Sequence, residues 1–500
     1  MNHTFKKAAA AALCAAFALP CLAACGDTPA HKTLDGTYSL VSALLDGKNV
    51  TKDFKIYTAT FSEEGTVRVV VNYMGALSTR NSTYSFDGTA VKENYGGEVY
   101  DYTLSGDQLT TVYRDYEDEI QITLEKEADQ NEVLPVDFGS ILFGSDMSDS
   151  KYYNYCPAIL RETTDEGEVM HFWYCTNRDD GVMMDYIGYR KGVKQENGKW
   201  LFGDEKIVLS PTEGTWDARH TCDPAVVKGS FKFQNRQYSY LMAYLGCVTD
   251  DYQKNETGIA VANSPEGPWV KVNTINPIVP WYDDGDYETE EQKYQDMKGT
   301  SSIYWGTGMP ALVSIDRSGE VLMFYQSTLR GTGIRRYDFS DLDNPELKED
   351  FTVSISSRGI VNSVGQTCRI GIPDFAYDSE SKRFYVCGVT NEKNPPDQTL
   401  TRVNSHSMVA YLENIENMSQ LCTLLQSGNY TWKMAGYVGP NDTGFERNHN
   451  PGIVRDAYGY LPDTSEIRVV VSTGHNSWDN ENIFTYRLHG AVIPAPRRSE

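Results

Sequence analysis

Asp223-Pro224-Ala225-Val226 is one of five stretches in which a proline is followed by small and apolar residues. The other four are Cys156-Pro157-Ala158-Ile159, Met309-Pro310-Ala311-Leu312, Ile372-Pro373-Asp374-Phe375 and Asn450-Pro451-Gly452-Ile453. Successive prolines are 67, 86, 63 and 78 residues apart. One proline at the first residue of a strand needs no special explanation, but five in register indicate a repeated structural unit.

Each proline is followed by apolar segments in the same order. A strongly apolar strand comes next, as at residues 240–244, and a third strand follows, as at 258–261 in the second repeat and 484–486 in the last. Fourth strands are expected near residues 206–209, 269–272, 351–355 and 432–437. Coincidence within a β-rich sequence is the alternative, but it leaves the shared order unexplained. The repeats therefore predict an all-β fold with a five-bladed β-propeller over residues 136–495, closed by a segment near 138–143.

The segment 33–127 alternates apolar and polar residues, with turn residues about every eight to twelve positions. Seven short strands are expected there, among them residues 67–71, 100–104 and 120–124. Seven antiparallel strands in so short a segment indicate a small closed β-barrel, because closure removes exposed sheet edges. The charged residues that follow end in Pro135 and predict a linker over residues 128–135.

The composition excludes one broad class of partner. The chain has 500 residues, with 45 Lys and Arg against 69 Asp and Glu, which gives a net charge of −24. This acidic balance argues against binding of nucleic acid, because no basic surface is expected to displace the counterions of a phosphate backbone.

The first residues have the pattern of an export signal. Lys6 and Lys7 precede an apolar stretch over residues 8–19, and Leu22-Ala23-Ala24-Cys25 follows. This pattern predicts a lipoprotein signal peptide over residues 1–24, lipid attachment to Cys25 and a polar tether over residues 25–32. An ordinary secretory signal with a chance cysteine is the alternative. We expect an extracytoplasmic chain that is lipid-anchored to a bacterial cell membrane.

Seven cysteines follow the predicted lipidation site: Cys156, Cys175, Cys222, Cys247, Cys368, Cys387 and Cys422. An odd number cannot all pair, and the absence of a Cys-x-x-Cys motif argues against a zinc site. We expect buried, small apolar side chains, with room for one or two disulfides in an exported protein.

Two stretches resemble known families. The second repeat contains the run Thr257-Gly258-Ile259-Ala260-Val261-Ala262-Asn263-Ser264-Pro265-Glu266-Gly267-Pro268-Trp269. This run resembles a strand-turn-strand motif of the five-bladed propeller glycosidases, most nearly glycoside hydrolase family 43. The stretch Leu34-Asp35-Gly36-Thr37-Tyr38 resembles the start of the lipocalin-like domains of bacterial lipoproteins. The first resemblance implies a glycan as partner and hydrolysis of O-glycosyl bonds, of an arabinofuranosidase or β-xylosidase type.

The resemblance also implies three carboxylates at the starts of inner strands. Asp223 stands directly before Pro224, where the family has the aspartate that orients the general acid and tunes its pKa. Cys156 and Gly308 stand where the family has the base and the acid, and Gly371 replaces the Glu of a related fructan-hydrolase motif.

Other carboxylates near the inner strands are therefore candidates for the missing roles, because glycoside hydrolysis needs two carboxyl groups. Asp374 follows Pro373, Glu446 precedes the fifth proline by a few residues, and Asp217 lies upstream of Asp223. The candidate catalytic set is Asp223, Asp374 and Glu446. For each member the alternative is a turn or rim carboxylate.

Further polar and aromatic side chains near the inner strands are candidates for substrate binding: Trp216, Arg219, His220, Arg369, Arg447 and His449. Trp216, Trp281 or Trp305 could stack on a sugar face, although tryptophan more often packs between blades. The resemblance allows His449 to hold a metal or a water on the propeller axis. Calcium is the candidate ion there, and no cofactor is required.

Three functions remain open at this point. The first is a membrane-anchored glycosidase, the second a surface glycan-binding lipoprotein without catalysis, and the third an adhesion or architectural lipoprotein. The absence of carboxylates at positions 156 and 308 favours the second function, whereas Asp223 and the motif of the second repeat favour the first.

Overall fold

The structure is a computed structural model. It describes residues 33–34, 36–62, 65–74, 76–115, 118–126, 134–144, 152–178, 182–249, 254–283, 289, 292, 305–327, 331–355, 358–368, 370–390, 405–474, 483–484 and 486–497. The predicted signal peptide, Cys25 and the tether lie outside the described residues. Contacts divide the chain into two compact units, residues 1–132 and 133–500, with the boundary inside the predicted linker.

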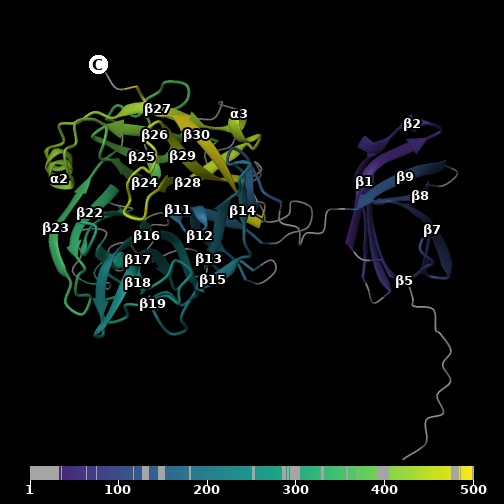
Figure 1. The fold of residues 1–500 in the computed structure, drawn as a ribbon, viewed down its shortest axis with the longest axis horizontal. Coiled ribbons are helices and arrows are strands. Elements are labelled where there is room, and N and C mark those ends of the chain that lie inside the picture. Colours follow the sequence, from purple (N-terminus) through teal and green to yellow (C-terminus); the bar gives the residue numbers. More distant parts are fainter. Residues whose placement is uncertain are drawn as a thin grey trace, which may run out of the picture. The chain divides into compact units, whose positions relative to one another are not determined.

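The first unit is a closed antiparallel barrel (Figure 1). Its strands are β1 (Gly36–Leu45), β2 (Lys48–Asn49), β3 (Phe54–Phe61), β4 (Thr66–Tyr73), β5 (Ala76–Phe86), β6 (Ala90–Tyr95), β7 (Glu98–Ser105), β8 (Gln108–Asp115) and β9 (Asp118–Lys126), with a 3-10 turn η1 (Thr51–Asp53). Neighbours in sequence pair from β3 to β9, and pairing of β1 with both β3 and β9 closes the ring. Alternate residues such as Val67, Val69 and Val71 fill the interior.

The expectation of seven strands in this unit was too low, because β2 and β6 were not predicted. Strand β6 turns Val91 and Glu93 inward, so a carboxylate occupies a position where the apolar alternation predicts an apolar side chain. Glu93 is fully buried and accepts hydrogen bonds from Arg80, at 3.1 Å from Nε, and from the Tyr102 hydroxyl at 2.7 Å. A buried charge needs such partners, and here the barrel interior supplies them.

The second unit is a propeller-like arrangement of small antiparallel sheets. One group has β11 (Asn154–Thr164), β12 (Gly167–Thr176), β13 (Tyr186–Lys194), β14 (Trp200–Phe202) and β15 (Lys206–Leu209). Three separate sheets follow: β16 (His220–Phe233), β17 (Arg236–Cys247), β18 (Glu256–Ala262) and β19 (Val270–Lys271); β20 (Thr307–Ser314), β21 (Glu320–Ser327), β22 (Gly331–Asp338) and β23 (Glu346–Val353); β24 (Ile370–Asp378), β25 (Arg383–Thr390), β26 (Ser407–Leu412) and β27 (Lys433–Val438).

The last group combines the two ends of this unit. Strands β28 (Arg447–Arg455), β29 (Glu466–Gly474) and β30 (Arg487–Pro494) are completed by β10 (Ile141–Gly144), which pairs with β30. The closing strand therefore comes from the segment near 138–143 that the sequence indicates. The third strand of this group begins at Arg487, so the expected strand at 484–486 was placed too early.

The innermost strands of the five groups form a ring. Strands β11, β16, β20, β24 and β28 contact one another in this order, and β28 pairs in parallel with β11 through Ile159 and Val454. Figure 1 shows β11, β16, β24 and β28 near the middle of the second unit. Hydrophobic clusters fill the spaces between neighbouring sheets, such as the cluster of Val227, Leu241 and Met323 between the second and third groups.

Each inner strand carries the same irregularity at its proline. The pairing register shifts between Tyr155 and Ala158 in β11 and at the corresponding point of the other four strands. The residue before each proline has a φ in the left-handed region: Cys156 (50°), Asp223 (46°), Met309 (49°), Ile372 (52°) and Asn450 (45°). Such values are uncommon for residues other than glycine, and a β-bulge of this kind redirects a side chain.

Little of the second unit is helical. Helix α2 (Met418–Ser427) begins at the cap residue Asn417, whose side chain accepts from the Gln420 amide, and ends at Gly428 with a positive φ. Two further short segments are α3 (Pro440–Thr443) and the 3-10 turn η2 (Trp281–Asp283). Among the described residues, none forms a helix long and apolar enough to cross a membrane.

Candidate functional site

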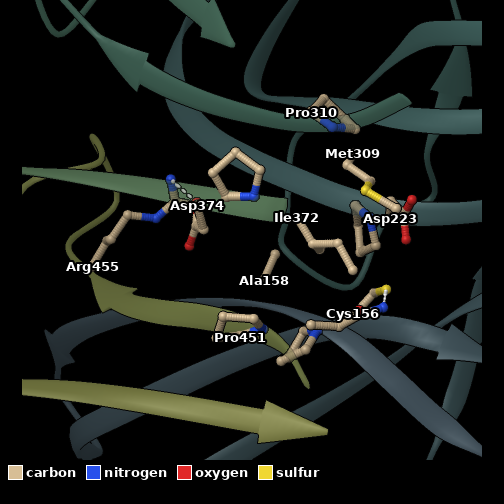
Figure 2. Close-up of a pocket in the computed structure, with 13 residues that line it drawn as sticks. Cys156, Ala158, Asp223, Met309, Pro310, Ile372, Asp374, Pro451 and Arg455 are labelled. Atoms are coloured by element: carbon tan, nitrogen blue, oxygen red, sulfur yellow. Dashed lines mark hydrogen bonds and ion pairs between the residues drawn. The ribbon is translucent and has the colours of Figure 1, made fainter. Parts of the chain in front are cut away.

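The five bulges surround a small cavity on the axis of the ring. This axial cavity has a volume of about 40 Å³ and is lined by the five prolines and the residues before them, together with Ala158, Asp374 and Arg455. Figure 2 shows Cys156 and Asp223 at one end of the cavity, and Asp374 and Arg455 at the other. These residues are free to line the cavity because the register shift removes two residues of each inner strand from regular pairing.

A second pocket, called the polar pocket below, shares part of this lining. The polar pocket has a volume of about 120 Å³ and is lined by Tyr155, Asp185, Cys222, Asp223, Leu245, Asn255, Trp305, Met309 and Asn450. Asp223, Met309 and Asn450 line both spaces, so the axial cavity and the polar pocket are adjacent. The polar pocket lies toward the N-terminal ends of the inner strands, because it takes residues at or before the bulges.

Asp223 is the sequence-predicted residue that both spaces share. Its side chain is buried, and burial raises the pKa of Asp223 to about 6. The Cys156 thiol donates a hydrogen bond to the Asp223 carboxylate, which opposes that rise. Burial and the nearby Asp223 charge raise the pKa of the Cys156 thiol well above its usual range. Cys156 therefore stands beside Asp223 as a protonated thiol.

Asp185 is a second buried carboxylate of the polar pocket, and the sequence analysis missed it. The hydroxyls of Tyr153 and Tyr155 donate to its Oδ1 at 2.7 and 3.1 Å, and the Nδ1 of His220 lies 2.9 Å from its Oδ2. The only sequence signal was its position directly before β13. His220, a predicted binding residue, is fully buried and orients Asp185.

Asp374 lies on the axis, but its carboxylate is occupied by contacts within the protein. It accepts from the backbone amides of Phe375 and Ile453 at 2.9 Å each, and its Oδ1 lies 3.2 Å from Arg455 Nη1. Burial raises the pKa of Asp374, whereas the Arg455 charge and the two amides oppose that rise. These contacts join β24 to β28, which indicates a structural role for Asp374 instead of the catalytic role expected from the sequence.

The residues around the fifth inner strand separate into an exposed and a buried set. Glu446 is exposed and lines neither the axial cavity nor the polar pocket, so the structure does not bring it to Asp223. Arg447 donates from Nη1 to the Tyr486 hydroxyl at 3.1 Å. His449 packs edge-to-face against Tyr486, with its Nδ1 2.8 Å from Asn450 Oδ1, and burial lowers the pKa of His449 to about 3.

Trp216 and Arg219, two further predicted binding residues, are not in the lining of the polar pocket. Trp216 packs on Tyr244, with ring centroids 5.4 Å apart, and fills the space left by Gly246 and Gly258, where a Cβ would come within 2.3 Å of the indole. The guanidinium of Arg219 contacts the Met183 carbonyl at 3.3 Å. Arg369 lies outside the described residues. Trp305, which the sequence offered only as one of three tryptophans, is the indole that lines the polar pocket.

Cysteine side chains line both spaces: Cys156 lines the axial cavity and Cys222 lines the polar pocket. A disulfide joins Cys175 of β12 to Cys222 of β16, and therefore links the first two groups of strands. Among the described cysteines, Cys156, Cys247, Cys368, Cys387 and Cys422 are buried and are not part of a disulfide. Among the described residues, one group of side chains could hold a metal ion: the sulfurs of Cys156, Cys175 and Cys222 with the Asp223 carboxylate. Calcium takes six to eight oxygen ligands, so this sulfur-rich group is not suited to calcium, and the calcium ion that the resemblance allows near His449 stays a prediction.

Comparisons with known proteins give fold similarity only. No family model and no curated protein matches the chain. It is similar to an α-L-arabinofuranosidase of Podospora anserina crystallised with cellotriose (10% identity; 72% of this chain and 96% of that chain; TM-score 0.40). It is also similar to an endo-arabinase of Bacteroides thetaiotaomicron (14%; 73% and 98%; 0.36) and to a GH43_1 enzyme of Xanthomonas citri complexed with xylotriose (12%; 71% and 90%; 0.38). At these values the similarities assign neither activity nor substrate.

Proposed function

We propose that the second unit is a five-bladed propeller of the glycoside hydrolase type and that it binds a glycan in the polar pocket. One observation carries this proposal: the same pocket is lined by polar side chains, which can bind sugar hydroxyls, and by an aromatic side chain, which can pack on the C–H face of a sugar ring. Asp185, Asn255 and Asn450 offer hydrogen-bonding groups for hydroxyls, and the Trp305 indole offers an apolar surface for the C–H face of a sugar ring.

Hydrolysis of the bound glycan is the second candidate function. It is favoured by the presence of two carboxylates, Asp185 and Asp223, in the lining of one pocket, since glycoside hydrolysis uses a pair of carboxyl groups. Binding without hydrolysis remains the first candidate, because Cys156 and Gly308 occupy the positions where the family resemblance expects the base and the acid.

A panel of oligosaccharides and aryl glycosides tests both functions with the same protein samples. Asp185→Asn and Asn255→Ala are each expected to weaken glycan affinity by about 10- to 100-fold, because each removes hydrogen bonds inside a buried pocket. Calorimetric titration measures the affinity, and chromatography of the products measures hydrolysis. If the protein is also a hydrolase, Asp223→Asn is expected to lower turnover by about 100-fold or more.

Asp204→Asn is the matched control, because Asp204 is exposed and lies outside the pocket lining. Affinity without product release from the unmodified protein would identify a glycan-binding protein. Unchanged turnover in Asp223→Asn would remove Asp223 from the reaction. Failure of every glycan to bind would refute the proposal.

We also propose that the chain is a membrane lipoprotein whose lipocalin-like barrel lies next to the lipidated end in sequence. Support comes from the Leu22-Ala23-Ala24-Cys25 sequence. Cys25→Ser is expected to abolish incorporation of a labelled fatty acid and to move the protein from the membrane fraction to the supernatant. Cys21→Ser, within the predicted signal peptide, is the control that should keep the label. Retention of the label in Cys25→Ser would contradict the anchor.

A further inference from the structure

Four potential metal ligands meet at the end of the axial cavity that Cys156 occupies. They are the thiol of Cys156 from β11, the sulfur of Cys175 from β12, and the sulfur of Cys222 and the carboxylate of Asp223 from β16. Their ligand atoms all lie within 4.8 Å of one another, and all four residues are buried. Two adjacent groups of strands therefore bring three sulfurs and one carboxylate to a single point.

The distances suit a tetrahedral ion bound by sulfur and oxygen. The Asp223 Oδ1 lies 3.3 Å from the Cys222 Sγ and 3.8 Å from the Cys175 Sγ. With bonds of about 2.3 Å to sulfur and about 2.0 Å to oxygen, a tetrahedral zinc site places sulfur and oxygen ligands about 3.5 Å apart. The sulfurs of Cys175 and Cys222 are bonded to each other, so they can act as two thiolate ligands only after the disulfide is reduced.

Two of the three sulfurs also have a hydrogen-bond donor beside them. The Asn450 Nδ2 contacts the Cys156 Sγ, and the backbone nitrogen of Asp223 lies 3.0 Å from the Cys175 Sγ. The Cys222 Sγ lies 3.2 Å from the Tyr155 hydroxyl oxygen, whose proton is donated to Asp185. Sulfur in a disulfide is a weak acceptor, whereas metal-bound thiolates carry charge that such donors stabilise. The surroundings of the sulfurs therefore resemble the outer shell of a metal–thiolate site.

We propose that Cys156, Cys175, Cys222 and Asp223 bind one thiophilic divalent cation of the zinc class when the Cys175–Cys222 disulfide is reduced. Four protein ligands fill a tetrahedral shell, so the ion would be structural and would hold the first two groups of strands together in place of the disulfide. Cys222 and Asp223 also line the polar pocket, but the two proposals are tested separately, because formation of the metal site is measured by bound metal and not by a sugar or a product.

The redox step balances with a dithiol as the reductant. Two electrons pass from the dithiol to the Cys175–Cys222 bond, the dithiol closes into its own disulfide, and its two protons go to the freed sulfurs. Binding of the cation then releases to solvent the thiol protons of the three cysteines, because thiolates are the ligands. A small-molecule disulfide reverses the sequence: it takes two electrons from the Cys175 and Cys222 thiolates and two protons from solvent, becomes a dithiol, and the ion is released. The axis thus has two alternative cross-links, one covalent and one metallic.

Titration of the purified protein with Cd²⁺ and Zn²⁺, before and after anaerobic treatment with a dithiol that is then removed, tests the proposal. The reduced protein is expected to bind one equivalent and to give the ultraviolet charge-transfer absorption of cadmium–thiolate bonds, and the oxidised protein is expected to give none. Cys156→Ser removes a ligand but leaves the disulfide pair intact. It is expected to weaken metal affinity by at least about 100-fold, since loss of outer-shell partners alone costs about 10- to 100-fold.

Cys387→Ser is the matched control. Cys387 is a free, buried cysteine on the second strand of its own sheet, the place that Cys175 has in β12, and its Sγ lies 3.6 Å from the Pro451 carbonyl. This variant should bind the ion with unchanged affinity, and circular dichroism establishes whether each variant is folded. The proposal is overturned if the reduced protein binds no cadmium through sulfur, or if Cys156→Ser and Cys387→Ser bind it equally well.

Discussion

Replacement of Arg455 with methionine is expected to lower the free energy of unfolding of the second unit by about 3–5 kcal/mol. The Arg455 side chain is fully buried and its Nη1 lies 3.2 Å from Asp374 Oδ1. The same nitrogen donates to the carbonyls of Leu312 and Phe375 at 3.0 and 3.1 Å. One guanidinium therefore connects β20, β24 and β28, and its loss leaves a buried carboxylate without its cation.

Urea unfolding followed by tryptophan fluorescence measures this loss selectively, because all eight tryptophans lie beyond residue 127 and none is in the barrel. Arg236→Met is the control. Arg236 is exposed on β17, and its replacement is expected to change the unfolding free energy by less than about 0.5 kcal/mol. The double variant Asp374→Leu/Arg455→Met should recover part of the loss, because it removes both buried charges. A loss below about 1 kcal/mol for Arg455→Met would contradict the structural role.

His449 is expected to make the second unit less stable as the pH falls. Burial, together with repulsion from the Arg447 charge, lowers its pKa in the folded state to about 3, against an ordinary value of 6.5. Below pH 6.5 the His449 imidazole therefore binds a proton in the unfolded chain but stays neutral in the folded chain. The stabilisation is complete above the unfolded pKa and is lost as the pH falls toward the folded pKa, by about 2 kcal/mol between pH 7 and pH 5.

His449→Gln is expected to remove this part of the pH dependence, whatever its effect on stability at neutral pH. The surroundings of the imidazole are the Tyr486 ring, the Asn450 side chain and Arg447, and no carboxylate is among the groups that shift its pKa. Urea midpoints for both proteins across pH 5–8 provide the measurement. If the two proteins lose stability in parallel as the pH falls, His449 takes up its proton equally in the folded and unfolded states.

The five proline motifs predicted the positions of the inner strands, because a proline at the same point of every repeat can be recognised directly in the sequence. Strand β30 was harder to place. Its sequence, Arg487-Leu488-His489-Gly490-Ala491-Val492-Ile493-Pro494, begins with polar and small residues, whereas Phe484 and Tyr486 just before it have the composition of a strand. Tyr486 instead packs its ring against His449, a tertiary contact that composition does not reveal.

The candidate site was predicted only where a motif marked it. Asp223 was found through its proline, whereas Asp185 lies in a connection between strands and is recognised only through the three side chains around it. The sulfur cluster was missed for a related reason. Its cysteines are separated by 19 and 47 residues, and the rule that looks for Cys-x-x-Cys detects ligands from one turn and not from three neighbouring strands.

The five left-handed bulges have a consequence for how this protein can change. Each bulge points one side chain at the axis, and those five residues are now a thiol, a carboxylate, a thioether, an aliphatic chain and an amide. The inner strand pairs with its neighbouring strand both before and after the bulge, and this pairing keeps the backbone in place. The residue at a bulge can therefore be exchanged without redirecting the backbone. The chemistry of the axis can therefore evolve through substitutions at positions 156, 223, 309, 372 and 450 while the blades stay the same.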